Sequence, residues 1–437
     1  RYPLRVEFFK YKEPTASIRL EWKPPHGTWS VLDQNHMIVA PSSRVFVAAT
    51  PFPADDRSLG YERGSSVSPE WHTAVNSAAI EAAAEVVSRL PLLTGTREDA
   101  PDRDAKLKDF VERLAQTAFR RPLDDAEREL LRDRVFQGVP NPEIGVRRAV
   151  LYILNSPHFL YTDLLSTDRA LTSYRAASRL SFALWDSIPD AALMDVASRG
   201  ELSERDQLVS QAKRMLKDER ARAKMLSFFH HWLEIDERDL SKDKQVFPEF
   251  DESVIADLRF SLESFVDEVV WSETSDYREL LLADYLLLND RLQQLYQASG
   301  TNPPDSLATD ESTADPSHFE RVQFAADRRA GVLTHPYLLS AFAYHNNTSP
   351  IHRGVFLTRN IVGRALKPPP VAVAFKDNEF ADDLTMREKV TELTRDRACM
   401  ACHSIINPLG FALENYDAVG RWRTRDNDKP VDTTSRY

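Results

Sequence analysis

The chain has 437 residues, of which 42% are hydrophobic and 28% charged, and its formal net charge at pH 7 is -11. This composition is typical of a globular chain with a buried core, and the length predicts about three domains. The negative charge argues against a nucleic-acid-binding protein, whose affinity depends mainly on Lys and Arg that neutralise phosphates. It leaves basic redox partners possible. No apolar run reaches the roughly 18 residues that cross a bilayer.

The beginning of the chain is its only clearly β-rich part. Apolar and polar side chains alternate over residues 4–8 and 18–22, which is the period of half-buried strands, and residues 24–27 (PPHG) are typical of a turn. Tyr11, Trp22 and Trp29 could stack on a sugar, but aromatic side chains also fill small sheets. We interpret residues 1–55 as the last part of a β module.

The central part predicts helices. The apolar spacing predicts helical domains over residues 56–166 and 167–300, and no strand pattern occurs between residues 100 and 295. Ser68 and Pro69 are an N-cap and first helical residue, and Asp124 with Glu127 is a capping box variant. The adjacent histidines His230 and His231 would face different sides of a helix and make a poor metal chelate. Helices are predicted near residues 69–90, 105–119, 143–154, 171–185, 203–216, 220–233, 251–271 and 289–296.

A connector rich in Pro, Asp, Ser and Thr predicts a domain boundary at residues 301–318. The C-terminal domain, residues 319–437, is again predicted helical. Pro350 stands at the first position of a helix, and Asp382 and Asp383 are expected to cap another that runs to residue 394. The fold class is therefore mainly α, a multi-domain helical protein with a small N-terminal β segment and a C-terminal domain resembling cytochrome c.

The chemistry of that C-terminal domain is concentrated in a C-x-x-C-H sequence formed by Cys399, Cys402 and His403. This pattern is typical of covalent attachment of one haem c. Two cysteines on one helical turn can form thioethers with both vinyl groups of a porphyrin, and the following histidine can bind the iron as proximal ligand. The chain has only 2 cysteines, so their pairing in this pattern is specific.

Two alternatives remain for these cysteines. A structural zinc site needs four ligands, and two distant histidines would have to complete it because no second cysteine pair exists. A thioredoxin-like dithiol should follow a strand in a βαβ unit, whereas residues 384–398 look helical and charged.

The sequence around this motif resembles the planctomycete-type cytochrome c domain proteins, a multi-domain family with associated helical domains of unknown function. The resemblance is carried by residues 119–123, 154–161, 329–333, 349–354, 399–403 and 406–421. It implies a predominantly helical haem protein in the periplasm or another extracytoplasmic compartment, with an export signal that this chain does not contain. It also implies a longer protein, whose missing N-terminal module, carbohydrate-binding or PA14-like, could bind carbohydrate.

Several residues are candidates for the iron ligand opposite His403. No methionine or histidine follows His403, so the candidates precede it: His335, His345, His352 and Met386. His352 is favoured by its place on a first helical turn beside Arg353, which could pair with a haem propionate. Met386 is the alternative, and an open sixth position or a ligand beyond the end of the chain also remains.

We therefore expect a monohaem c-type cytochrome that transfers single electrons to or from a redox partner protein. Two alternatives stay open. One is an oxidoreductase linked to haem or cytochrome that acts on carbohydrate or a small molecule, although the chain lacks a nucleotide-binding glycine motif and a placed catalytic carboxylate pair. The other is a cell-surface binding or assembly protein with a structural haem. An electron-transfer protein is favoured over a stand-alone enzyme.

Overall fold

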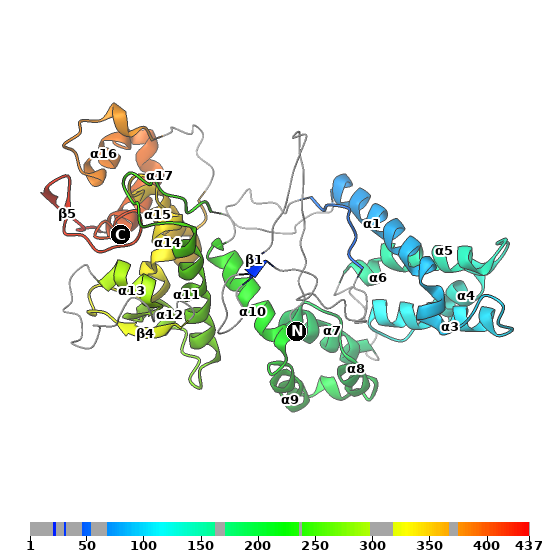
Figure 1. Ribbon diagram of the computed structural model, residues 1–437. Helices are drawn as coiled ribbons and strands as arrows, with labels where there is room; N and C mark the ends of the chain where they lie inside the picture. Colours follow the sequence, from blue (N-terminus) through cyan, green and yellow to red (C-terminus); the bar gives the residue numbers. More distant parts are fainter. Residues whose placement is uncertain are drawn as a thin grey trace.

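A computed structural model describes residues 21–22, 30–31, 46–53, 68–161, 171–235, 238–297, 318–366 and 375–436 of the chain. It confirms a mainly helical fold (Figure 1). Of the predicted N-terminal β segment, the structure describes the antiparallel pair β1 (Glu21–Trp22) and β2 (Ser30–Val31). The other predictions for residues 1–45 lie outside the described residues. Within the described part, no helix has the length and apolar character required to traverse a lipid bilayer.

The first helical unit packs around its own apolar core, which includes Leu107, Val111 and Val146. Its helices begin at caps that the sequence predicted. The Ser68 hydroxyl accepts a hydrogen bond from the Trp71 amide, and Asp124 and Glu127 form a reciprocal capping box. The elements are α1 (Pro69–Ser88), α2 (Leu90–Thr94), α3 (Arg103–Phe119), α4 (Asp125–Arg132), the 3₁₀ turn η1 (Arg134–Phe136), α5 (Pro142–Asn155) and α6 (Pro157–Leu160).

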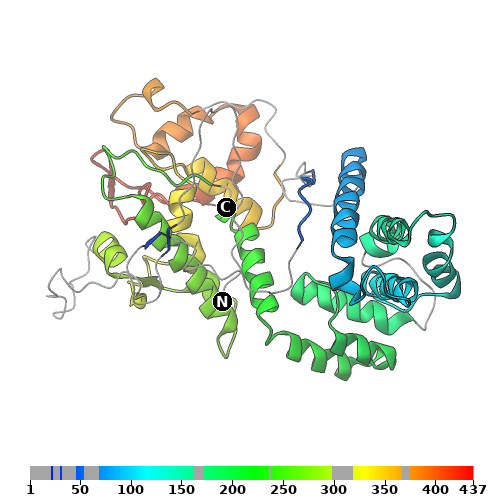
Figure 2. The same cartoon turned by 45° about the vertical axis from the view of Figure 1, so that its right-hand side comes forward.

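A second, smaller core lies in the following helices. Trp185 is buried there, donates from its indole nitrogen to the Met215 carbonyl at 3.0 Å, and is covered by the guanidinium of Arg220. The last helix of this group contributes Phe229 to the next core, so it connects the two (Figure 2). The elements are α7 (Thr172–Trp185), α8 (Ala191–Ser198), the 3₁₀ turn η3 (Glu201–Ser203), α9 (Arg205–Met215) and α10 (Glu219–Trp232).

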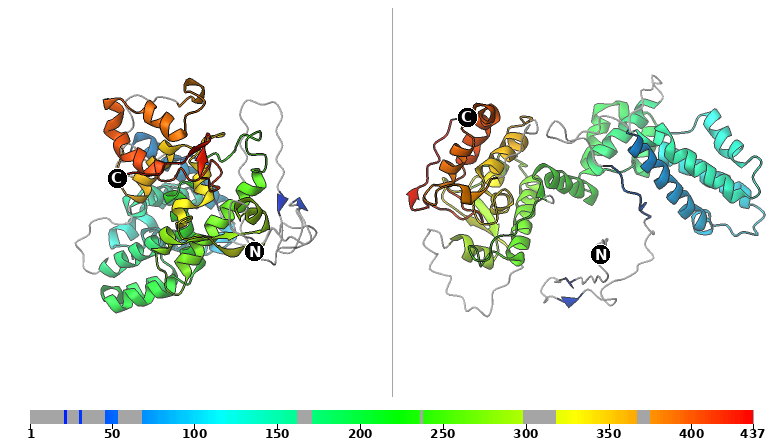
Figure 3. Two further views of the ribbon diagram at one scale, coloured as in Figure 1. Left: turned by 90° about the vertical axis from the view of Figure 1, so that its left-hand side faces the viewer. Right: turned by 90° about the horizontal axis from the view of Figure 1, so that it is seen from above.

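The largest core extends from Phe229 to Val419 and is organised around the buried face of α11. Its elements up to the last strand of the core are α11 (Glu252–Trp271), α12 (Glu279–Leu282), β3 (Tyr285–Leu288), α13 (Asp290–Gln297) and β4 (Glu320–Gln323). They are followed by the 3₁₀ turn η5 (Gly331–Thr334), α14 (Pro336–Ala341), α15 (Pro350–Phe356), the π-helical turn η6 (Leu357–Ile361), the 3₁₀ turn η7 (Asp377–Glu379), α16 (Met386–Leu393), α17 (Arg397–Phe411), β5 (Arg425–Asp426) and β6 (Lys429–Pro430). In both views of Figure 3 the orange and red C-terminal elements lie against the yellow and green ones.

One prediction about this region is wrong. Residues 285–288, where no strand was expected, form β3, which pairs antiparallel with β4 so that Leu286 lies opposite Val322. The predicted boundary at residues 301–318 lies between β3 and β4, and described residues on both sides of it pack into one core. The two paired strands are more than 30 residues apart in the sequence. The apolar pattern near residues 285–288 therefore did not indicate that they pair with residues 320–323.

Smaller differences concern helix ends. Residues 331–341, in the C-terminal domain that was predicted helical, form a 3₁₀ turn followed by the six-residue helix α14. Helix α16 is capped by Thr385, whose hydroxyl and the Glu388 side chain form a capping box, and not by Asp382 or Asp383. Pro350 does stand at the start of α15, after the Ser349 cap.

Candidate haem attachment site

The C-x-x-C-H sequence lies on the first two turns of α17. Cys399 and His403 are half-buried, Cys402 is exposed, and neither thiol is in a disulfide. Residues spaced three and four apart share one face of a helix, so these three side chains form one stripe, which continues through Ile406 and Gly410. The three groups that would hold a haem c are thus on the same side of one rigid element.

A chain of hydrogen bonds fixes the His403 imidazole. The Thr394 hydroxyl donates to the Val390 carbonyl at 2.8 Å and accepts from the Asn407 amide nitrogen at 2.9 Å. The Asn407 amide oxygen is therefore the atom that faces His403 Nδ1, at 2.9 Å. Nδ1 carries the proton and donates, which leaves a lone pair on Nε2. Iron-ligating histidines are commonly held in this way by their second nitrogen.

Asn407 and Thr394 are site residues that sequence reasoning missed. Helix α17 continues through Pro408 to residue 411, and the Asn407 side chain provides the hydrogen-bond acceptor for His403. The spacing of four residues between His403 and Asn407 was the available signal, because it places both on one helix face.

Two glycines bring α17 into close contact with α15. A Cβ atom on Gly354 would lie 2.2 Å from the Ile406 carbonyl oxygen, and one on Gly410 would lie 1.9 Å from the Pro350 carbonyl oxygen. The helices are antiparallel at this crossing, since four residues forward on α15 correspond to four residues back on α17. The next turn along, η6, also contacts α17 and follows the same register toward the cysteines.

A groove of about 790 Å³ opens beside His403. It is lined by His403 and Asn407 of α17, by α16 and by residues 434–436, and neither cysteine lines it. Because Cys399, Cys402 and His403 share one face of α17, these residues fit the covalent attachment of a haem c.

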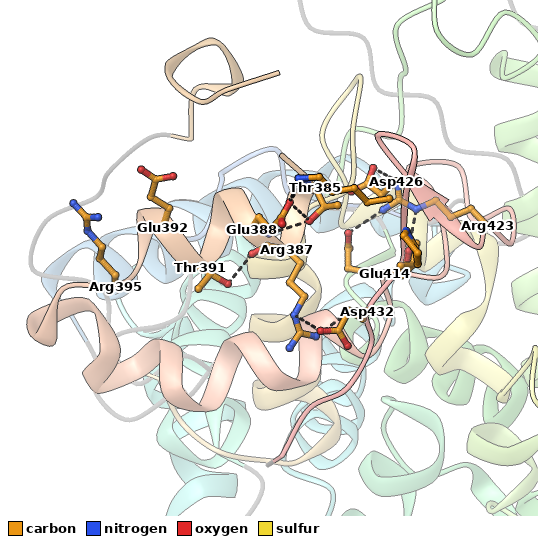
Figure 4. Close-up of a pocket in the computed structure, with 13 residues that line it drawn as sticks. Thr385, Arg387, Glu388, Thr391, Glu392, Arg395, Glu414, Arg423, Asp426 and Asp432 are labelled. Carbon is orange, nitrogen blue, oxygen red and sulfur yellow. Dashed lines mark hydrogen bonds and ion pairs between the residues drawn. The ribbon is translucent and has the colours of Figure 1, made fainter. Parts of the chain in front are cut away.

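A second hollow, of about 440 Å³, lies between α16 and the β5–β6 hairpin (Figure 4). Its charges largely neutralise one another. Arg387 pairs with Asp432, Arg423 pairs with Asp426 at 2.8 Å and with Glu414, and Lys429 pairs with Glu388. These pairs join the hairpin to α16 and to the segment after α17, and we interpret the hollow as structural.

The structure places Arg353 in the interior, where only 1% of the residue is exposed. Its two terminal nitrogens donate to the carbonyls of Leu339, Leu413, Tyr416 and Asp417 at 2.7 to 3.1 Å. Glu414 lies 3.7 Å away and is equally buried. Burial lowers the pKa of Arg353 to about 10 and raises the pKa of the Glu414 carboxyl. The predicted pairing of Arg353 with a haem propionate is therefore not one that this geometry offers.

His352 lies on the face of α15 opposite α17, because it is half a turn from Pro350 and Gly354. Its ring packs against Tyr344, with centroids 5.3 Å apart, and desolvation and the positive charge of Arg238 lower its pKa. Met386 is 1% exposed and packs with Val390 and Phe411. The structure thus brings neither predicted sixth ligand to His403.

The two other histidines considered as ligands are held elsewhere. His345 is exposed, and its Nδ1 donates to the Ser241 carbonyl at 2.8 Å. His335 is fully buried between α14 and α11. Its Nδ1 accepts from the Tyr337 amide and its Nε2 faces the Ser261 hydroxyl at 3.2 Å, so both ring nitrogens are occupied.

We expect His335 to make the protein sensitive to acid. Burial lowers its pKa to about 3, so it stays neutral in the folded state, while in the unfolded chain it titrates near 6.5. The contribution of neutral His335 to the free energy of unfolding is present above pH 6.5. It is lost as the pH falls from 6.5 toward 3, at about 1.4 kcal/mol per pH unit, because the unfolded chain then binds a proton that the folded chain does not. Urea unfolding at pH 7, 6 and 5 should show this loss.

The matched variant is His335→Asn, which keeps a buried polar side chain but does not titrate. Its free energy of unfolding should start lower at pH 7 and should fall less steeply between pH 6.5 and 5 than that of the wild type. If the free energy of unfolding falls equally steeply with decreasing pH in the two proteins, His335 is not the cause of the loss of stability at acid pH.

The zinc alternative finds no support in the described residues, among which no three His, Cys, Asp or Glu side chains converge as metal ligands. His230, one of the two adjacent histidines, instead lies 2.9 Å from the Glu263 carboxylate, consistent with a role in packing α10 against α11. The C-x-x-C pair also lies within a helix that follows another helix, not at the end of a strand as in a thioredoxin-like dithiol.

Three family models match the chain. PSD5 matches residues 106–163, PSD4 matches residues 171–298 and PSCyt3 matches residues 329–426. Each is described as a protein of unknown function, with the respective designations DUF1595, DUF1592 and DUF1588. No curated protein and no solved structure matches the chain.

These three domains are the ones associated with planctomycete-type cytochrome c proteins. The chain therefore carries a domain set of that group, and the matches give its domain composition without giving a cofactor. Their edges fall beside the boundaries expected from the sequence at residues 166 and 301–318. At the second of these the domains are distinct in sequence but share one hydrophobic core.

Proposed function

We propose that the protein is a monohaem c-type cytochrome that transfers single electrons in an extracytoplasmic compartment. The observation that carries the proposal is the α17 stripe, in which Cys399, Cys402 and His403 share one face. The bond from His403 Nδ1 to Asn407 supports it further, because it leaves Nε2 without this partner and able to bind a metal.

Each residue has a definite role in this proposal. The sulfur atoms of Cys399 and Cys402 tether the porphyrin, and Nε2 of His403 binds its iron. When bound, the haem supplies a one-electron redox centre. Asn407 and Thr394 hold the imidazole in one orientation and one tautomer, which keeps the ligand geometry constant when the iron changes its charge.

Electron transfer is favoured over substrate chemistry by the surroundings of the stripe. Cys402 is exposed and Cys399 and His403 are only half-buried, so a haem edge there would be accessible to a redox partner. The cavities beside α16 and α17 are open grooves lined mainly by charged and polar residues. Small-molecule sites are usually mostly apolar and enclosed.

The test is to express the chain with an export signal in cells that attach haem c, and to purify it. We expect a mass increase of one haem that survives denaturation, and a reduced spectrum with the α-band of a c-type cytochrome. Cys399→Ala and Cys402→Ala should each weaken the covalent attachment, and the double variant should abolish it. Met400→Ala, within the same motif, is the matched control and should retain the haem.

A colourless wild-type protein with free thiols or bound zinc, made in cells that load a control cytochrome c, would overturn the proposal. A haem protein that binds carbon monoxide rapidly and turns over a substrate would show that the iron serves catalysis and not simple electron transfer.

A further inference from the structure

The π-helical turn η6 carries an arginine that has no carboxylate partner among the described residues. Arg359 is half-buried, and its Nε is buried without a hydrogen-bond acceptor. Its one hydrogen bond in the described part of the chain is a long one, 3.3 Å from a terminal nitrogen to the Leu366 carbonyl. A buried donor of a charged group is energetically unfavourable when it stays unpaired, so an acceptor is expected there.

The described residues of the chain do not provide that acceptor. None of the described Asp or Glu side chains lies within ion-pair distance of Arg359, and residues 367–374, which follow the same segment, contain neither Asp nor Glu. Arg353, six residues earlier, has four carbonyl partners and a buried carboxylate nearby. The two arginines of this segment therefore differ in their hydrogen bonds. The terminal nitrogens of Arg353 donate to backbone carbonyls of the folded chain, whereas the Nε donor of Arg359 has no acceptor among the described residues.

The position of η6 indicates what the acceptor is. Gly354 lies against Ile406 and Pro350 lies against Gly410, so the antiparallel register carries η6 toward the turn that holds Cys399 and Cys402. The turn is held in place from the other side, where the Asn360 amide donates to the Trp232 carbonyl and the Trp232 indole donates to the Asn360 carbonyl, both at 2.6 Å. π-helical turns of this kind are frequent at functional sites.

We propose that the Arg359 guanidinium binds a propionate carboxylate of the haem attached to α17. This inference rests on the proposed function, because it requires the haem. A guanidinium and a carboxylate can form two parallel charge-assisted hydrogen bonds, and Nε with one terminal nitrogen is a suitable pair of donors. The bond would connect the porphyrin edge to η6, and through Asn360 to the end of α10.

The experiment compares the holoprotein with Arg359→Gln, Arg359→Lys and the control Arg113→Gln, which removes an exposed charge on α3. The readouts are the propionate bending bands of the resonance Raman spectrum and the reduction potential. Loss of a positive charge beside the haem should favour the ferric state. At a fixed ambient potential we expect the oxidised-to-reduced ratio of Arg359→Gln to rise up to about tenfold, which is about 59 mV for one electron.

The Lys variant keeps the charge but cannot form the planar double bond, so its propionate bands should shift while its potential stays near that of the wild type. The control should change neither. Propionate bands identical to the wild type in either Arg359 variant would overturn the pairing. If the Gln variant does not fold, as judged by circular dichroism, the Lys variant still decides. A wild type without haem would refute the proposed function instead, so the two failures are distinguishable.

Discussion

Replacing Arg353 with methionine is expected to lower the free energy of unfolding by about 3–5 kcal/mol, the cost of removing one partner of a buried ion pair. The substitution leaves Glu414 buried beside an apolar side chain, although Thr348 and Arg423 still bond it at 2.9 Å. It also removes the donors that join the carbonyl of Leu339 on α14 to three carbonyls after α17. The measurement is urea unfolding followed by circular dichroism at pH 7.

The matched control is Arg364→Met, which removes an exposed arginine eleven residues further along the same segment. Its effect should stay within about 0.5 kcal/mol, as for most surface substitutions. The double variant Arg353→Met with Glu414→Leu should recover part of the loss, because no buried carboxylate is then left uncompensated. If Arg353→Met unfolds within 1 kcal/mol of the wild type, the guanidinium does not hold these elements together.

Gly410→Ala is expected to destabilise the protein although alanine is the better helix former. Helix propensity alone favours alanine over glycine by about 1 kcal/mol. The added Cβ would lie 1.9 Å from the Pro350 carbonyl oxygen, and a backbone atom of a packed helix cannot move aside as a flexible side chain can. Overpacking costs typically 1–3 kcal/mol and occasionally more. We therefore expect a net loss of about 2 kcal/mol or more in urea unfolding.

Gly354→Ala tests the same crossing from the other helix, where the Cβ would lie 2.2 Å from the Ile406 carbonyl oxygen. Ala398→Leu, which adds bulk on the exposed side of α17, is the control and should change stability little. Equal or greater stability of both would show that the two helices do not cross as closely as described.

Local chemistry explains what could be predicted from the sequence. A cap and its helix lie within four residues of each other, so Ser68, Asp124 and Pro350 mark helix starts wherever the helix packs. The attachment motif is equally local, since its three side chains share one turn of helix. For the same reason the apolar periods predicted α7, α11 and α13 to within one or two residues.

Contacts between distant residues explain the rest. Nothing near Arg353 in the sequence indicates that its acceptors lie at residues 339 and 413–417, and nothing near residues 285–288 indicates a strand partner at residues 320–323. For the same reason the sequence did not indicate that His352 lies on the face of α15 opposite α17. The side of α15 that faces α17 is determined by the close approach of the two helices at Gly354 and Gly410.

The sequence by itself determined that this is a mainly helical chain with a C-x-x-C-H motif on one helical turn, because both depend on residues close together in the chain. Only the tertiary structure determined which side chains surround that motif. In that structure the Asn407 side chain contacts the His403 imidazole, Arg353 is buried in the interior, and Arg359 has no carboxylate partner among the described residues. The physical reason is that burial and pairing of a charged side chain depend on all elements packed around it, and these come from distant parts of the chain.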